Sequence, residues 1–216
     1  ELIYEKAFSA KKLIIPDGEV IFDVQRTNYP RFSAETFVRG YGIPIQEAYH
    51  DELFPELKDV RQADMFEHVG LSGGPSRPGN TIRKVYLSRS AANLEQPGSL
   101  LFFYKGKSIG PPSQAITAVG VFEQMERAHS TKELMQLTQR RSVYSEAQLE
   151  RWEATADRPV KVINFLLAGY FDDPVKLADL QELGVMQAHP SQAIFQINRV
   201  PLESLLRRLN LGFEVL

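Results

Sequence analysis

Basic and aromatic residues gather in the middle of the sequence at a spacing that suits nucleic-acid binding. Arg83, Lys84 and Arg89 fall within seven positions, with Tyr86 between them and Tyr104 further along the chain. Guanidinium groups bind phosphate oxygens through paired hydrogen bonds, and aromatic rings stack on nucleobases. We therefore expect Arg83 and Arg89 to contact phosphates and Tyr104 to stack on a base. The sequence leaves one alternative open, a solvated basic surface beside ordinary core aromatic residues.

The sequence gives no indication of a metal site or of a catalytic thiol. It has no cysteine, and no two of its four histidines are three or four positions apart: His50, His68, His129 and His189. A metal site built from neighbouring ligands on one helix is therefore not expected, and no cofactor is expected.

The basic residues must lie on a helix or strand that exposes them to a ligand. The sequence pattern favours a helix over residues 81–88. Asn80 or Thr81 would cap it, and three apolar residues would share one face at i, i+3 and i+4: Ile82, Val85 and Tyr86. The preceding residues 72–79 are rich in glycine and proline and predict a mobile loop beside the site.

Continuous apolar runs bounded by turn signals predict buried strands at 100–104, 116–122 and 160–167. Gly120 interrupts the second run, which indicates a bulge or a close approach to the backbone. These strands predict a core made of nine residues: Leu101, Ile116, Ala118, Val119, Val121, Val162, Ile163, Phe165 and Leu167.

The rest of the chain predicts elements around this core. Residues 1–35 read as an N-terminal hairpin, with a return strand at 20–24 that follows a Pro-Asp-Gly turn, and residues 36–216 as one domain. A short helix capped by Ser33 is expected at 34–39, and one helical turn at 49–55. Residues 125–155 contain two capping boxes, at Ser130 and Ser145, and predict a helical insertion. Helices at 177–183 and 201–209 and a strand at 194–197 complete the chain.

Composition limits the classes of function. Of the 216 residues, 43% are apolar and 24% are charged, which is ordinary for a globular protein with a sizeable core. The net charge is −2, so nucleic-acid binding would have to come from a local patch. No apolar run is long enough to cross a membrane, and the lack of cysteine favours a reducing compartment, so we expect a cytoplasmic protein.

Three stretches carry a family resemblance: Asn80-Thr81-Ile82-Arg83-Lys84-x-Tyr86-Leu87, Pro97-Gly98-Ser99-Leu100-Leu101-Phe102-Phe103-Tyr104, and Ile116 to Glu123. Their order resembles the PUA-like superfamily, in particular its EVE and ASCH branches. The resemblance implies an α+β fold, a twisted β-barrel with rim helices, which binds RNA or a modified nucleobase. Such a base would lie between the 80–88 helix and the strands carrying Tyr104 and Thr117. Asn80 and Thr81 would read its edge.

Some ASCH-type proteins resemble amidohydrolases of acylated nucleosides, with a Gly-x-Lys-Thr stretch that supplies lysine and threonine. The corresponding run here is Gly79-Asn80-Thr81, in which asparagine stands at the lysine position. Asparagine can neither attack nor take a proton at neutral pH, so a non-catalytic binding module is expected. Lys84 is the residue that could restore catalysis, if it were buried beside Thr81 and a carboxylate such as Glu123 with a lowered pKa.

Two further alternatives stay open. Residues 1–8 resemble the closing strand of GNAT-type acetyltransferases, which would make this chain an accessory domain of an enzyme whose active site lies upstream. A protein-interaction domain is favoured if Arg83 and Arg89 pair with buried carboxylates. The sequence does not determine the ligand, a preference for RNA over DNA, or the oligomeric state.

Overall fold

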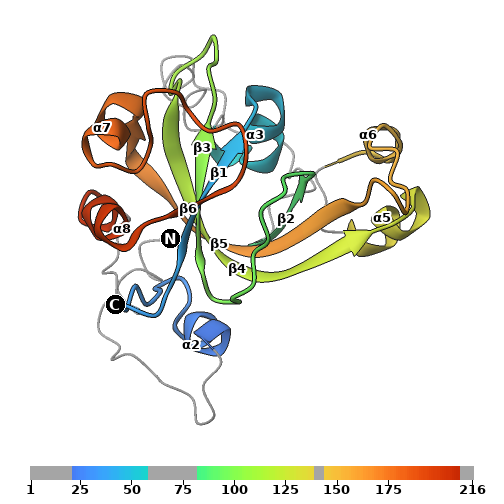
Figure 1. Ribbon diagram of the computed structural model, residues 1–216, viewed down its shortest axis with the longest axis horizontal. Helices are drawn as coiled ribbons and strands as arrows, with labels where there is room; N and C mark the ends of the chain where they lie inside the picture. The colour runs from blue at the N-terminus through green and yellow to red at the C-terminus, as the bar shows by residue number, and fades with distance from the viewer. Residues whose placement is uncertain (1–20, 58–81, 139–143, 210–216) are drawn as a thin grey trace, which may run out of the picture.

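The strands expected at 100–104, 116–122 and 160–167 are neighbours in one mixed six-stranded sheet (Figure 1). The computed structural model describes residues 21–57, 82–138 and 144–209. The strands are β1 (Gly40–Ile45), β2 (Arg83–Ser88), β3 (Leu100–Lys105), β4 (Ala115–Ala128), β5 (Val160–Lys176) and β6 (Phe195–Ile197), in the order β2-β5-β4-β3-β1-β6. The helices are α2 (Ile21–Asn28), α3 (Glu47–Leu53), α5 (Thr131–Thr138), α6 (Glu146–Glu150), α7 (Leu177–Glu182) and α8 (Arg199–Leu206). The fold is therefore α+β.

Strand β3 lies in the interior of the sheet, parallel to β1 on one side and antiparallel to β4 on the other. All its residues are buried. A strand that is covered on both faces needs apolar residues on both, which explains the continuous run Leu100–Tyr104. Among the described strands no pairing joins β2 to β6, so they do not close the barrel expected from the sequence.

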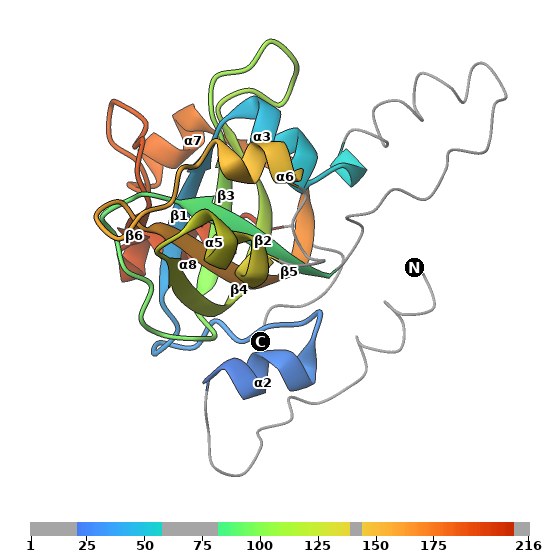
Figure 2. The same ribbon diagram turned by 90° about the vertical axis from the view of Figure 1, so that its right-hand side faces the viewer.

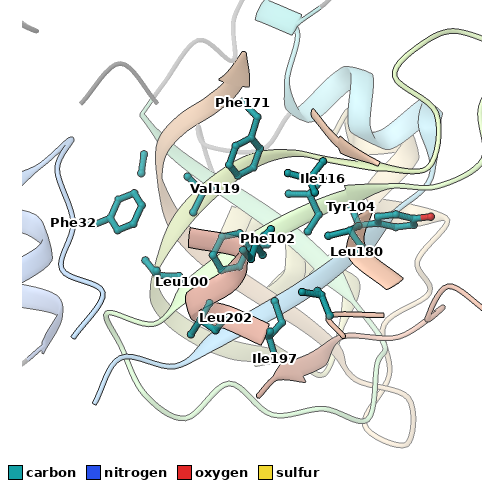
Figure 3. Close-up of a cluster of buried hydrophobic side chains, with 14 of the residues drawn as sticks. Phe32, Leu100, Phe102, Tyr104, Ile116, Val119, Phe171, Leu180, Ile197 and Leu202 are labelled. Atoms are coloured by element: carbon teal, nitrogen blue, oxygen red, sulfur yellow. The ribbon is translucent and has the colours of Figure 1, made fainter. Parts of the chain in front are cut away.

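Each face of the sheet carries its own hydrophobic cluster. On one face, Phe102 packs with Leu180 of α7 and Leu202 of α8 (Figure 3). On the other, Phe103 packs against Phe54, just after α3, with ring centroids 5.0 Å apart. Eight of the nine expected core residues are buried: Leu101, Ile116, Ala118, Val119, Val121, Val162, Ile163 and Phe165. Leu167 is half-buried.

Gly120 lies where the register between β4 and β5 shifts, as its position in an apolar run indicated. A Cβ atom at this position would lie 2.6 Å from Cδ2 of Phe165 and 3.1 Å from the Leu166 carbonyl oxygen. Since Phe165 is fully buried, its ring has no open space into which to move. The close approach of the two strands therefore requires glycine.

Strands β4 and β5 continue beyond the body of the sheet as an arm that carries α5 and α6 at its end (Figure 1); Figure 2 views the molecule from that side. The expected capping box at Ser145 forms, whereas at Ser130 only the hydroxyl half does, because the Glu133 carboxylate accepts from the His129 N–H instead. The Ser145 hydroxyl accepts a hydrogen bond from the Gln148 N–H while the Gln148 side chain accepts one from the Ser145 N–H. The Ser130 hydroxyl likewise accepts the Glu133 N–H at 3.1 Å. The expected helical insertion is thus present between two long strands.

The helix expected at 81–88 is wrong, because Arg83–Ser88 is strand β2, paired antiparallel with β5. Val85 and Leu87 pack under α5 and α6, whereas Tyr86 packs on the opposite face near Phe103. Side chains that alternate between two apolar environments need a period of two, which a helix does not provide. Pairing with β5 therefore outweighs the local capping signal.

Three further local expectations are wrong. The return strand at 20–24 falls on helix α2, which Gln25 ties to the sheet by donating to the Gly98 carbonyl at 3.0 Å. At 34–39 the Ser33 hydroxyl accepts the Glu35 N–H, but only a single turn follows, closed by the bond from the Val38 N–H to the Glu35 carbonyl. Residues 125–128 belong to β4 and not to a helix. In each case long-range contacts override a short local pattern.

The remaining expected elements are present. Helix α3 covers the expected turn, and α7 ends before Gly184, which has φ +70°. Strand β6 and helix α8 follow as expected. The first strand of the N-terminal hairpin and the loop 72–79 lie outside the described residues. Within the described ranges, no helix is both long and apolar enough to cross a membrane.

Candidate functional site

A cleft of about 830 Å³ opens where the body of the sheet meets the base of the arm. One wall is the end of β1 with the start of α3, and another is the end of β2. The end of β3, Tyr144 and Trp152 on either side of α6, and residues 190–194 complete it. Five segments that are far apart in the sequence therefore form one cavity, large enough for a nucleotide-sized ligand.

Partly exposed aromatic side chains from three of these segments line the cleft. Tyr49 on α3 is 37% exposed, and Tyr86 on β2 and Trp152 after α6 are half-buried. Tyr144 is buried behind them, with its ring centroid 5.9 Å from that of Tyr49. The Tyr86 hydroxyl donates to the Pro44 carbonyl at 2.9 Å, and burial raises its pKa to about 12. Tyr86 therefore presents a neutral ring to a ligand at physiological pH.

Arg89 lies at the edge of the cleft, exposed at the end of β2. Its guanidinium carbon lies 5.7 Å from the centre of the Trp152 ring. The same guanidinium donates to the Trp152 carbonyl and, at 3.3 Å, to the Glu153 carbonyl. Arg89 thus fixes the start of the chain that follows α6 against β2, and it places a positive charge beside the aromatic rings.

A buried ionic network supports the wall made by α3. The Lys105 ammonium at the end of β3 lies 3.3 Å from both Glu47 and Asp51, one helical turn apart on α3. His50 bridges the network to β4, since its Nδ1 lies 3.1 Å from Asp51 and its Nε2 lies 2.8 Å from the Thr117 hydroxyl.

Glu47 is the member of this network that also lines the cleft. Burial would raise the pKa of Glu47, but the N–H of Ile109 and the ammonium of Lys105 outweigh that effect and lower it. The cleft is therefore lined by a negative charge at Glu47 as well as by positive charges at Arg89 and Lys107.

A second buried cluster surrounds Lys84. Its ammonium lies 3.7 Å from Glu56, whose other carboxylate oxygen accepts a hydrogen bond of 2.6 Å from the Tyr170 hydroxyl. Burial lowers the pKa of Lys84, and Glu56 offsets part of that effect. The pKa of Tyr170 is raised by burial and then by Glu56. The carboxylate beside Lys84 is thus Glu56, whereas Glu123 pairs with Arg83 at 2.7 Å.

Of the expected site residues that the structure describes, two line the cleft, Arg89 and Tyr104. Tyr104 contributes to the cleft wall, but its ring belongs to the hydrophobic core and is 2% exposed, so stacking on this ring would require it to move (Figure 3). Thr117 is fully buried and bonded to His50. Arg83 and Lys84 do not line the cleft.

Asn80 and Thr81 lie outside the described residues, as does the run Gly70-Leu71-Ser72-Gly73-Gly74, which fits the nucleophile motif Gly-x-Ser-x-Gly.

Sequence reasoning missed Tyr49 and Trp152, which line the cleft, and the pair Glu47 and Lys105, which supports its α3 wall. The four-residue spacing of Glu47 and Asp51 was visible in the sequence, but the helical turn expected at 49–55 left Glu47 out, and only α3 places the two on one face. Nothing local could link that face to Lys105, 54 residues after Asp51. In the described ranges no group of three or more His, Asp and Glu residues is placed to hold a metal ion.

The fold is similar to that of solved ASCH domain structures. One is a mutant of ZmASCH from Zymomonas mobilis, with a TM-score of 0.54 and 14% identity over 79% of this chain and 99% of that one. A second mutant has a TM-score of 0.52 and 16% identity over 79% and 96% of the two chains. The unaltered ASCH protein has a TM-score of 0.52 and 15% identity over 80% and 96%. No family model and no curated protein matches this chain.

Proposed function

We propose that the cleft binds a nucleobase, in RNA or as a modified base, and that this chain is a non-catalytic binding module. The observation that carries this proposal is the set of partly exposed rings, Tyr49, Tyr86 and Trp152, which converge on one cavity from three separate segments. Rings that are half-buried can stack on a ligand without leaving their place in the fold. Each base stacked on an aromatic ring contributes about 1–3 kcal/mol.

The charges at the mouth of the cleft fit the same ligand. Arg89 and Lys107 are exposed at its rim, where they can meet phosphates that flank a bound base. The protein has a net charge of −2, so attraction over its whole surface adds little to binding. Local interactions at this rim must then supply the electrostatic part of the affinity.

The ring residues can be tested by titrating short single-stranded RNAs and free modified nucleosides against the protein. Tyr49→Ala and Trp152→Ala should each weaken binding about 5- to 150-fold, as expected when 1–3 kcal/mol of stacking is removed. Phe37→Ala is the matched control, because Phe37 is 53% exposed and does not line the cleft. If both cleft variants keep the fold and bind RNA as tightly as the wild type, the cleft is not the binding site.

The contributions of Arg89 and Arg83 to phosphate binding can be distinguished by the salt dependence of RNA affinity. When a protein loses one ionic interaction with a phosphate of a single strand, the slope of log K against log salt falls in magnitude by about 0.7. We expect this change for Arg89→Ala. Arg83→Ala serves as the comparison, since Arg83 is paired with Glu123 away from the cleft. If the slope of log K against log salt is unchanged in Arg89→Ala, Arg89 does not contact a phosphate.

A second candidate, hydrolysis of acylated nucleosides, is favoured by one observation: Lys84 is buried with a lowered pKa beside Glu56. A lysine of this kind can act as a base or nucleophile. Because Lys84 is not among the residues that line the cleft, we expect purified protein not to turn over N4-acetylcytidine. Turnover that disappears in Lys84→Ala would establish the hydrolase instead.

A further inference from the structure

The ammonium of Lys161, on β5, is surrounded by oxygen atoms of one short segment. It lies 2.6 Å from the Ser90 carbonyl, 3.2 Å from the Ala91 carbonyl, 2.7 Å from the Ala92 carbonyl and 3.1 Å from Oδ1 of Asn93. An ammonium carries three protons, so four acceptors use its full donor capacity. The residue is 8% exposed, and water therefore contributes little to its coordination.

The segment after β2 is bent so that these oxygens converge. The Ser88 hydroxyl accepts the Ser90 N–H at 3.0 Å, and the Ser90 hydroxyl accepts the Ala92 N–H at 3.3 Å. Such turns point successive carbonyls to one side of the chain. Three aligned carbonyl dipoles repel one another unless a positive charge lies between them. Lys161 supplies that charge, and a second cation, Arg127, binds the same Asn93 oxygen at 2.9 Å.

The same segment forms a wall of the cleft. Ser88, Arg89 and Ser90 line it, and the Arg89 guanidinium lies over the Trp152 ring. We propose that Ser90–Asn93 forms a binding site for a small monovalent cation, which the chain fills with its own Lys161 ammonium, and that this interaction positions Arg89 against Trp152. Lys161 is then a positioning residue for the cleft, and its effect on ligand affinity rests on the function proposed above.

Removing the ammonium should leave a cation site that an added ion can fill. Trp152 is the single tryptophan of the protein, so its fluorescence reports directly on the position of Arg89. In Lys161→Ala we expect the Trp152 emission to shift and the affinity for a short single-stranded RNA to fall about tenfold, an effect typical of groups that orient a binding residue. Ammonium or potassium chloride should restore both properties. Tetramethylammonium chloride at equal ionic strength should not, because its methyl groups can neither donate to the carbonyls nor fit between them.

Three variants control for other causes. Lys161→Met keeps the aliphatic stem without the charge, so it separates the ammonium from packing if the alanine variant does not fold. Lys161→Arg keeps the charge but brings a planar group too wide for the site, and it should behave like Lys161→Met. Lys132→Ala removes an exposed lysine on the same arm and should change neither readout.

The outcomes are distinct. Wild-type emission in Lys161→Met without added ions, or equal restoration by tetramethylammonium, overturns the cation site. A shifted emission that potassium restores, with unchanged RNA affinity, shows that the site exists but does not position the cleft, which overturns that half of the proposal. If the wild type binds no RNA while the emission is still restored by potassium, the proposed function fails and the cation site stands.

Discussion

Replacing Lys105 by methionine tests whether buried charge holds the cleft wall in place. The Lys105 side chain is 1% exposed and lies 3.3 Å from two carboxylates, Glu47 and Asp51, whose side chains are 33% and 17% exposed. Methionine fills the volume of the aliphatic stem but removes the ammonium that lies beside both carboxylates. Removing one partner of a fully buried ion pair costs about 3–5 kcal/mol. Since both carboxylates keep some contact with water, we expect Lys105→Met to lower the free energy of unfolding by about 2–3 kcal/mol.

Neutralising the carboxylates as well should repair much of this destabilisation. In the triple variant Lys105→Met, Glu47→Gln, Asp51→Asn, neutral amides replace both carboxylates, and more than half of the stability should return. The measurement is urea unfolding followed by circular dichroism, with the free energies compared at one temperature and salt concentration. The RNA affinity of Lys105→Met should also fall, because α3 carries Tyr49 into the cleft.

Two results would refute this account. A change below about 0.5 kcal/mol in Lys105→Met would mean that the network contributes no net stability. A triple variant as unstable as the single one would show that poorer packing, and not unpaired charge, causes the effect. Asp51→Asn alone is informative as well, since it keeps the shape of the side chain and weakens the bonds to Lys105 and His50.

The other predictions concern the sheet and its response to acid. Gly120→Ala should cost about 1–3 kcal/mol because its Cβ would meet Phe165, and adding Phe165→Leu should relieve part of this; Gly106→Ala, whose Cβ would meet only the Ile45 carbonyl oxygen at 3.5 Å, should be near neutral. An equal cost for both glycines would contradict the steric argument. Ile163→Ala should cost about 2–5 kcal/mol in urea unfolding, against less than about 0.5 for the exposed Ile82→Ala, and similar values would place Ile163 outside the core. The lowered pKa of Glu47 gives stability that is present above the unfolded pKa and lost as pH falls through the folded one. Glu47→Gln should therefore lose less stability than the wild type between neutral pH and about pH 3, and parallel losses would show that Glu47 is not linked to folding.

The local sequence determined two kinds of element: those held by hydrogen bonds between near neighbours in the chain, and those buried on every side. The run Leu100–Tyr104 could only be a buried strand, because apolar residues at every position fit an element that is covered on both faces. The caps at Ser130 and Ser145 close hydrogen bonds within four residues, so sequence alone specifies where α5 and α6 begin. Gly120 indicated a close approach, although nothing in the sequence said that Phe165 would be the neighbour.

Tertiary structure alone decided the elements and sites whose partners are distant in the chain. The local pattern of residues 81–88 favoured a helix, and pairing with β5 about eighty residues later selects a strand at 83–88 instead. The basic residues there then fall into three environments: Arg83 beside Glu123, Lys84 beside Glu56, and Arg89 in the cleft. No local sequence pattern distinguishes the environments of Arg83, Lys84 and Arg89. The partners of each cation are acceptor groups from distant parts of the chain, which only the fold places beside it. Lys105 and Lys161 are buried for the same reason, and the cleft exists only where five separate segments meet.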